Sequence, residues 1–169
     1  NEHFHSVHGA VQESEFIFIK NGYDLCHCDP LHILEVGFGT GLNTLLTVTK
    51  AAGEQRKVFY TALEKYPLDN QIIRSLNHHH FAGNKGKEIF EKIHSSLWEE
   101  IVNISPGFSL LKRKCDLITD DINGSFDIIY FDAFSPDKQP EIWKKEILEK
   151  IARLTKPGGI FITYSAKGE

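Results

Sequence analysis

Short apolar runs alternate with amphipathic stretches along most of the chain. Apolar runs with the length and composition of buried strands occupy residues 31–36, 57–63, 108–115, 126–131 and 160–164. Apolar residues three or four positions apart, the spacing typical of helices, occupy residues 42–52, 67–76, 94–104 and 140–154. Another apolar run, residues 15–19, ends at the turn signal Asn21-Gly22, and the polar residues 77–93 predict no definite element.

Strands that alternate with helices predict an α/β fold, a mostly parallel sheet with helices on both faces. We expect a single domain over residues 1–169, with an N-terminal extension at residues 1–30 and the sheet-forming core at residues 31–169. In such sheets ligands bind beyond the carboxyl ends of the strands. Glu35, Glu64, Asp116 and Asp132 lie at or near predicted strand ends, so we expect them to share one site.

Composition narrows the class of protein. The 169 residues are 41% hydrophobic and 25% charged, which is typical of a soluble globular domain. We expect no membrane span, because no apolar run approaches the roughly 20 residues that a span needs. We also expect no signal peptide, because residues 1–8 are polar and rich in histidine. The cysteines, Cys26, Cys28 and Cys115, are odd in number, which favours free thiols in a reducing cytoplasm. We expect no metal site, since Cys26 and Cys28 are closer in sequence than a usual zinc pair.

The formal net charge of −4 differs from the strongly basic balance of many nucleic-acid-binding proteins. Basic clusters do occur, at residues 112–114, at residues 144–145, and at Lys150, Arg153 and Lys156. We interpret each of them as a solvated face. Any contact with RNA must then use local charge, or an added domain or partner.

A glycine-rich turn follows the first predicted strand and offers the most specific chemistry. Gly37, Gly39 and Gly41 allow the backbone to bend tightly and to approach a ligand. The neighbouring Glu35 would repel a phosphate but would bind an ammonium group, which favours S-adenosylmethionine over a nucleotide phosphate. Glu64, at the end of the next strand, could accept hydrogen bonds from ribose hydroxyls. Asp116 could hold the adenine amino group, cap the segment that follows it, or do both.

The segment after the most hydrophobic strand suggests what accepts the transferred group. Asp132, Phe134 and Pro136 are similar to the acid, proline and aromatic signature of amino-group methyltransferases. The carboxylate can accept a hydrogen bond from an attacking amine and orient its lone pair. Methyl transfer from a sulfonium is an in-line displacement, so alignment supplies most of the acceleration and no metal is required.

Three segments together resemble the methyltransferase domain of the MnmC-type enzymes of tRNA 5-methylaminomethyl-2-thiouridine synthesis, in its stand-alone MnmD form. They are residues 8–18, residues 35–43 with residues 64–68, and residues 132–143 with residues 156–159. The resemblance implies a Rossmann-like class I fold that transfers a methyl group from S-adenosyl-L-methionine to the primary amine of 5-aminomethyl-2-thiouridine at the tRNA wobble position. It also implies a separate flavin oxidase upstream and a cytoplasmic location. Relatives continue beyond the fifth core strand, so we expect the C-terminal strands of the sheet to be missing here.

The resemblance assigns roles to individual residues. Its catalytic residues are Asp132, Phe134 and Pro136. Its cofactor-binding residues are Glu35, Gly37, Phe38, Gly39, Thr40, Gly41, Asn43, Glu64, Lys65, Asp116 and Asp132. Its substrate-binding residues are Phe134, Lys138 and Trp143.

Two other functions remain compatible with these patterns. One is a class I methyl- or aminopropyl-transferase that acts on another amine. The other is a non-catalytic module that binds the cofactor or RNA.

Overall fold

A mostly parallel sheet forms the centre of the molecule in the computed structural model, which describes residues 9–165 except for the side chains of His79 and Phe81. The strands are β1 (Leu31–Val36), β2 (Val58–Glu64), β3 (Ile101–Ser105), β4 (Phe108–Lys114), β5 (Phe126–Phe131) and β6 (Thr155–Ile162). Within residues 9–165 they form a six-stranded sheet in the order β3-β4-β2-β1-β5-β6. Only the β3–β4 pair is antiparallel among these strands.

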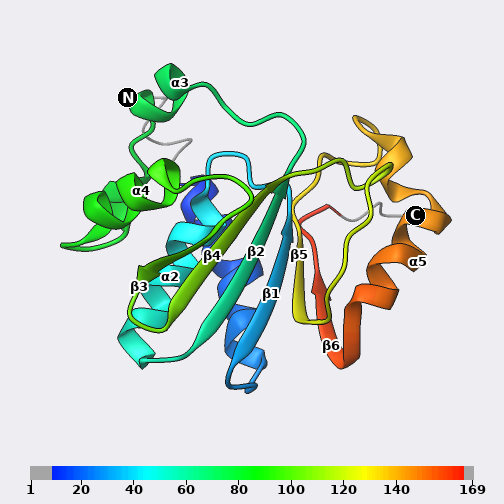
Figure 1. Ribbon diagram of the computed structural model, residues 1–169, viewed down its shortest axis with the longest axis horizontal. Helices are drawn as coiled ribbons and strands as arrows, with labels where there is room; N and C mark the ends of the chain where they lie inside the picture. Colours follow the sequence, from blue (N-terminus) through cyan, green and yellow to red (C-terminus); the bar gives the residue numbers. More distant parts are fainter. Residues whose placement is uncertain (1–8, 166–169) are drawn as a thin grey trace.

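Helices cover both faces of this sheet (Figure 1). The α-helices are α2 (Leu42–Glu54), α3 (Asn70–Ser75), α4 (Gly86–Ser95) and α5 (Lys145–Leu154). The other helical elements are the π-helix η1 (Glu15–Lys20) and the 3-10 turns η2 (Tyr23–Leu25), η3 (His78–Phe81) and η4 (Pro140–Trp143). Elements η1, α2 and α4 pack on one face, and η4 and α5 pack on the other. The predicted α/β class, with helices on both faces, is confirmed.

The alternation of side chains along β1 explains why the sheet needs cover on both sides. Leu31 and Ile33 join the core beneath η1, α2 and α4, whereas Leu34 and Val36 join the core beneath η4 and α5. Successive side chains of a strand point to opposite faces, so a strand buried on both faces is apolar at nearly every position. By the same alternation Glu35 points to the α2 side, where it is fully buried.

Two central strands begin and end where the sequence predicts, at residues 31–36 and 126–131. The predicted helix over residues 94–104 is wrong. Helix α4 already ends at Ser95, Trp98 makes a parallel bridge to Lys112, and β3 follows at Ile101. The polar residues 77–93 instead contain most of α4. Its buried face consists of only Gly86, Phe90 and Ile93, which explains why its pattern was faint.

Smaller corrections concern the bounds and type of several other elements. The apolar run at residues 15–19 lies in η1, which continues a helix from residues 9–14. The predicted helix at residues 67–76 is confined to α3, and the one at residues 140–154 is divided into η4 and α5. Residues 157–159, with the sequence Pro-Gly-Gly, would favour a turn but lie within β6, where the pairing with β5 shifts register.

One residue of the basic cluster at residues 112–114 does not lie on a solvated face. Lys112 is 1% exposed, and its Nζ donates hydrogen bonds to the carbonyls of Ile93 (2.8 Å) and His94 (3.2 Å) at the end of α4. Its ammonium group lies 5.0 Å from the centre of the Trp98 ring. Burial lowers the pKa of Lys112 to about 8. A helix C-terminus favours a cation, so Lys112 fastens α4 to the sheet.

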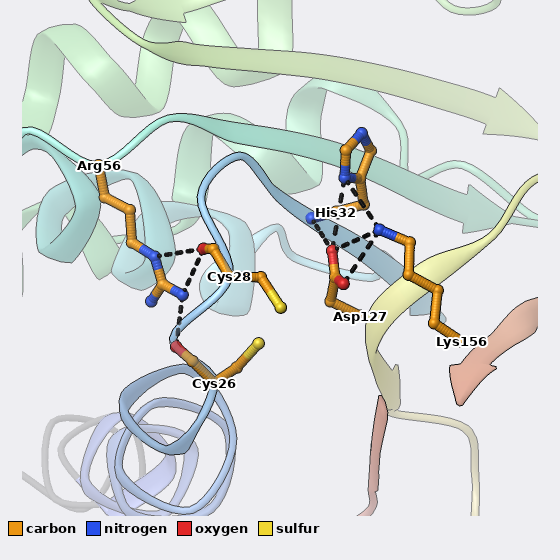
Figure 2. A network of polar contacts seen from close by, with 6 residues as sticks. All are labelled: Cys26, Cys28, His32, Arg56, Asp127 and Lys156. Atoms are coloured by element: carbon orange, nitrogen blue, oxygen red, sulfur yellow. Dashed lines mark hydrogen bonds and ion pairs between the residues drawn. The ribbon is translucent and has the colours of Figure 1, made fainter. Parts of the chain in front are cut away.

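A polar network joins the strands at the edge where β1 and β5 begin (Figure 2). The Asp127 carboxylate accepts hydrogen bonds from the His32 backbone N–H (2.9 Å) and from Lys156 Nζ (3.0 and 2.9 Å). Burial alone would raise the pKa of Asp127, but its hydrogen bonds from Lys156, His32 and Cys28 outweigh burial and lower it. The network thus connects β1, β5 and β6 through one buried carboxylate.

The cysteines beside this network are free thiols, as predicted. The Cys28 thiol lies next to Cys26 and Asp127, and hydrogen bonds with these two groups raise its pKa to about 11. The Lys156 ammonium already compensates the charge of Asp127.

No helix among residues 9–165 is both long enough and apolar enough to cross a membrane.

Candidate active site

The carboxyl ends of β1, β2, β4 and β5 surround a cavity of about 440 Å3. Its walls come from the loops that follow these strands, together with the N-terminal helical segment and the end of the chain's last described strand. Ten of the residues predicted for the site line it, namely Gly37, Phe38, Gly39, Thr40, Asn43, Glu64, Lys65, Asp116, Asp132 and Phe134. The structure therefore brings together residues that are up to 97 positions apart (134 − 37).

The turn between β1 and α2 requires glycine at its first position. Gly37 has a φ of +92°, and a Cβ atom there would lie 2.6 Å from the carbonyl oxygen of Asp132. The backbone N–H groups of Gly37 and Phe38 both donate to the Leu63 carbonyl, at 3.0 Å each. The absence of a side chain at Gly37 thus lets the loops after β1 and β5 touch, while β2 holds the turn from the other side.

Glu35 lies beneath the cavity and does not line it. The carboxylate is fully buried, accepting hydrogen bonds from Thr44 Oγ1 (3.0 Å) and Asn43 Nδ2 (3.1 Å) at the start of α2. Burial, followed by the negative charge of Asp132, raises the pKa of Glu35 to about 8. Glu35 is therefore mostly protonated at neutral pH unless a cation lies nearby. The expected contact with an ammonium group would have to displace this proton or pass through Asn43.

Asn43 connects Glu35 to Asp132. Its Nδ2 also donates to Asp132 Oδ2 at 2.7 Å, so one amide group spans both carboxylates. Burial raises the pKa of Asp132 to about 6, against the opposing effect of the Asn43 hydrogen bond and with a smaller contribution from the negative charge of Glu13. Asp132 is therefore mostly ionised at neutral pH. Asn43 also lines the cavity, and its Oδ1 is buried without a hydrogen-bond partner among the described residues.

Two further acids hold the opposite wall. Glu64 accepts hydrogen bonds from the backbone N–H groups of Gly39 and Tyr66, at 2.9 Å each. Asp116 pairs with Lys65 at 2.9 Å and accepts a hydrogen bond from the backbone N–H of Ile118 at 3.0 Å. These two hydrogen bonds lower the pKa of Asp116. Asp116 thus organises the turn after β4 and also lines the cavity, while its contact with an adenine amino group stays a prediction.

Of the site residues predicted in and after the loop that follows β5, some line the cavity and others do not. Phe134 lines the cavity and is 64% exposed. Trp143 donates from Nε1 to the Phe134 carbonyl (2.8 Å) and packs edge-on against Phe131, 5.0 Å between ring centres. Pro136, Lys138 and Trp143 are not among the cavity-lining residues, and Lys138 is exposed. Gly41, another predicted site residue, lies behind the turn against the Phe38 ring.

Several cavity residues escaped the sequence-based assignment. They are Ala10, Glu13, Ser14, Phe18, Tyr66, Ile118, Gln139 and Tyr164, among others. Tyr66 and Tyr164 follow the ends of β2 and β6, so the rule about strand ends could have found them. Glu13 and Ser14 belong to a helical segment before the first strand, and no local pattern indicates that this segment reaches the cavity.

The donor and acceptor groups suit a cationic ligand that also carries hydroxyl groups. Carboxylate residues Glu64, Asp116 and Asp132 line the cavity, and so does Asn43, whose Oδ1 is buried and has no hydrogen-bond partner among the described residues. An ammonium group or a ribose is a natural partner for such acceptors, whereas phosphate is not. These groups fit S-adenosyl-L-methionine, which has an ammonium group, a sulfonium and a ribose.

Comparison with protein families agrees with this fit. The family described as S-adenosyl-L-methionine-dependent methyltransferase matches residues 89–169. The tRNA 5-methylaminomethyl-2-thiouridine biosynthesis bifunctional protein MnmC of Haemophilus ducreyi is 26% identical over 193 residues, covering 96% of this chain and 27% of that protein. The MnmC protein of Campylobacter concisus is 27% identical over 176 residues, covering 98% and 28% respectively. The chain thus spans about a quarter of the length of these curated relatives.

Solved structures show the same architecture. The crystal structure of MNMC2 from Aquifex aeolicus superimposes with a TM-score of 0.73 at 25% identity, covering 93% of this chain and 51% of that one. The S-adenosylmethionine-dependent methyltransferase SibL in its apo form has a TM-score of 0.51 at 17% identity, covering 96% and 38%. The latter likeness concerns the fold alone.

Proposed function

Because the chain resembles the methyltransferase domain of MnmC proteins and its cavity suits S-adenosyl-L-methionine, we propose that it methylates 5-aminomethyl-2-thiouridine at the tRNA wobble position. The product is 5-methylaminomethyl-2-thiouridine. The observation that carries the proposal is the position of Asp132. Its carboxylate lines the cavity next to the glycine turn and is held there by Asn43.

Asp132 is suited to receive an amine. With a pKa of about 6 it is mostly ionised at neutral pH, so it can accept a hydrogen bond from a neutral primary amine. That hydrogen bond would direct the nitrogen lone pair away from the carboxylate and toward the methyl group. A base with a pKa close to neutrality is also better matched to remove a proton from an ammonium ion than an ordinary aspartate is.

The other acids would bind the methyl donor. S-adenosyl-L-methionine, when bound, supplies a methyl group on a positively charged sulfur, which is a good leaving group. We assign its ammonium end to Asn43 Oδ1 with Glu35 behind it, its ribose to Glu64, and its adenine region to Asp116 and Lys65. The turn at residues 37–41 would contribute backbone contacts. The carboxylates of Glu64 and Asp116 would stabilise the positive charge of the donor.

Phe134 would bind the base. An aromatic side chain that is 64% exposed at the cavity wall provides a stacking surface for a nucleotide that has been turned out of its strand. Trp143 would fix the backbone beneath Phe134 through its hydrogen bond to that carbonyl. Pro136 would stiffen the same loop, and the exposed Lys138 would reach a phosphate.

The wider setting is part of the same proposal. Residues 1–169 would act as one methyltransferase domain in the cytoplasm, and a separate flavin oxidase would generate the amine. Methyl transfer itself needs no metal, because the sulfonium already provides the leaving group.

The test is a methyl-transfer assay with radiolabelled S-adenosyl-L-methionine and tRNA that carries 5-aminomethyl-2-thiouridine. The wild-type chain should label this tRNA, and Asp132→Asn should reduce the rate about a hundred-fold or more. Glu146→Gln, at an exposed acid of α5 outside the cavity, is the matched control and should retain the wild-type rate. A wild-type chain that binds the donor but leaves this tRNA unlabelled would overturn the proposal. Labelling of small amines alone would favour a different amine substrate.

A further inference from the structure

We infer that Asn43 positions Asp132 for the amine and that its amide, which also donates to Glu35, couples this position to the cofactor side of the cavity. The inference rests on the proposed function, because it concerns the same acid. It gives Asn43 a role beyond contact with the cofactor. Asn43 would act through Asp132 and would thereby be a positioning residue.

The geometry leaves little freedom to the Asn43 amide. The side chain is 2% exposed, in the first turn of α2 immediately after the glycine turn. The two hydrogens of Nδ2 are used by Glu35 Oε1 at 3.1 Å and by Asp132 Oδ2 at 2.7 Å. An amide nitrogen has only these two hydrogens to donate, so both are committed.

The hydrogen bond also determines which oxygen of Asp132 is available. Oδ2 is occupied by Asn43, whereas Oδ1 accepts no hydrogen bond from any residue among 9–165. With one oxygen anchored, the carboxylate cannot rotate freely, and the second oxygen keeps a fixed direction. Proximity and direction are what an attacking amine needs from its acceptor.

The chemistry explains why an amide suits this position. Asp132 and Glu35 are close enough for the charge of Asp132 to raise the pKa of Glu35. An amide between them donates to both acids without adding a charge. A carboxylic acid in its place would add a third acid to the cluster, and an apolar side chain would leave both acids without this donor.

A cofactor bound in the cavity would affect the hydrogen bond to Asp132 through the same amide. Asn43 Oδ1 is buried and has no partner among the described residues, so an ammonium group that reaches it would break no existing hydrogen bond. A cation at Oδ1 polarises the amide and strengthens both N–H donors. The hydrogen bond to Asp132 would therefore be strongest when the methyl donor is bound.

Thr44 provides a matched control. It donates to the other oxygen of Glu35 at 3.0 Å but makes no contact with Asp132 among its described hydrogen bonds. Asn43→Leu and Thr44→Val each remove one hydrogen bond to Glu35 with little change in volume. Only Asn43→Leu also removes the hydrogen bond to Asp132. Asn43→Asp keeps the size and an acceptor oxygen, and removes the donors.

The first measurement is the pKa of Asp132 by carboxyl-carbon NMR titration, which does not depend on activity. Loss of the Asn43 donor should raise this pKa by about one unit in Asn43→Leu. Thr44→Val should leave it at the wild-type value. An unchanged Asp132 pKa in a folded Asn43→Leu protein would overturn the inference, whatever the substrate is.

The second measurement is the rate of methyl transfer to the same tRNA at saturating S-adenosyl-L-methionine. We expect kcat to fall about ten- to a hundred-fold in both Asn43 variants, as for loss of a hydrogen bond to a charged group. The acidic limb of the pH profile of Asn43→Leu should move to higher pH, and that of Thr44→Val should not. Equal losses of kcat in Thr44→Val and Asn43→Leu, with no movement of the limb, would refute the positioning role. An inactive wild type would instead refute the proposed substrate.

Discussion

The carboxylate of Glu64 accepts a hydrogen bond from the backbone N–H of Gly39, with 2.9 Å between Oε2 and the nitrogen. Its other oxygen, Oε1, accepts one from the backbone N–H of Tyr66 at 2.9 Å. The acid at the end of β2 thus joins the turn after β1 to the loop after β2. A ribose that binds Glu64 would have to share the carboxylate with these two N–H groups.

Glu64→Ala should therefore weaken binding of S-adenosyl-L-methionine for two reasons. It would remove an acceptor for the ribose hydroxyls, and it would release the glycine turn. We expect the Kd to rise about ten-fold or more, as for loss of a hydrogen bond to a charged group. Isothermal titration calorimetry measures this directly, with Glu146→Gln as the control. A Kd equal to that of the wild type would exclude Glu64 from the cofactor site.

Gly37→Ala should destabilise the fold. The residue has a φ of +92°, and the added methyl group would lie 2.6 Å from the Asp132 carbonyl oxygen. We expect the free energy of unfolding to fall by about 2 kcal/mol or more in urea titrations. Gly53→Ala is the matched control, since Gly53 lies in α2 and a Cβ atom there would meet no atom within 4 Å. It should stabilise the protein by about 0.5–1 kcal/mol. Equal effects of the two changes would contradict this account of the turn.

Glu35 should make stability depend on pH. Its pKa is raised to about 8 in the folded protein from an ordinary value of 4.5, so the unfolded chain releases this proton more readily. The contribution of Glu35 is therefore most favourable below about pH 4.5 and is lost as pH rises toward 8. Glu35→Gln stays neutral and should melt several degrees higher than the wild type at about pH 9, in the absence of cofactor.

The same comparison at about pH 5 is the control, where the two proteins should melt at similar temperatures. Differential scanning calorimetry at both pH values provides the measurement. A difference in Tm that is the same at both values would mean that ionisation of Glu35 is not its cause.

Phe134→Ala should affect RNA binding more than cofactor binding. Stacking of one base on an aromatic side chain contributes about 1–3 kcal/mol, so the Kd for the tRNA should rise about ten-fold or more. Affinity for S-adenosyl-L-methionine should stay within about two-fold of the wild type, since Phe134 is assigned only to the base. Phe16→Ala is the control, because Phe16 is 61% exposed and does not line the cavity. Fluorescence anisotropy with labelled tRNA measures this Kd. Equal losses of tRNA affinity in both variants would argue against stacking on Phe134.

Local patterns were reliable where burial is the same on both faces. Strands β1 and β5 are mostly apolar and lie where the sequence predicts. Patterns failed where few side chains of an element are buried. In β3 only Ile104 is buried, so nothing in the local pattern distinguished this strand from the end of a helix. The predicted solvated face is wrong for Lys112, because this side chain is buried by a contact with α4, which is distant in the sequence.

The sequence by itself determined the class of fold, the glycine turn and the acids that end four strands. Those features depend on neighbours in the chain, through the periodicity of strands and helices and the φ values that glycine allows. Only the tertiary structure decided that Glu35 lies beneath the cavity and that Asn43 joins it to Asp132. It also decided that Glu13 reaches the same cavity from before the first strand. These relationships depend on how β1, β5 and α2 pack, and packing joins residues that are 89 positions apart by a 2.7 Å hydrogen bond.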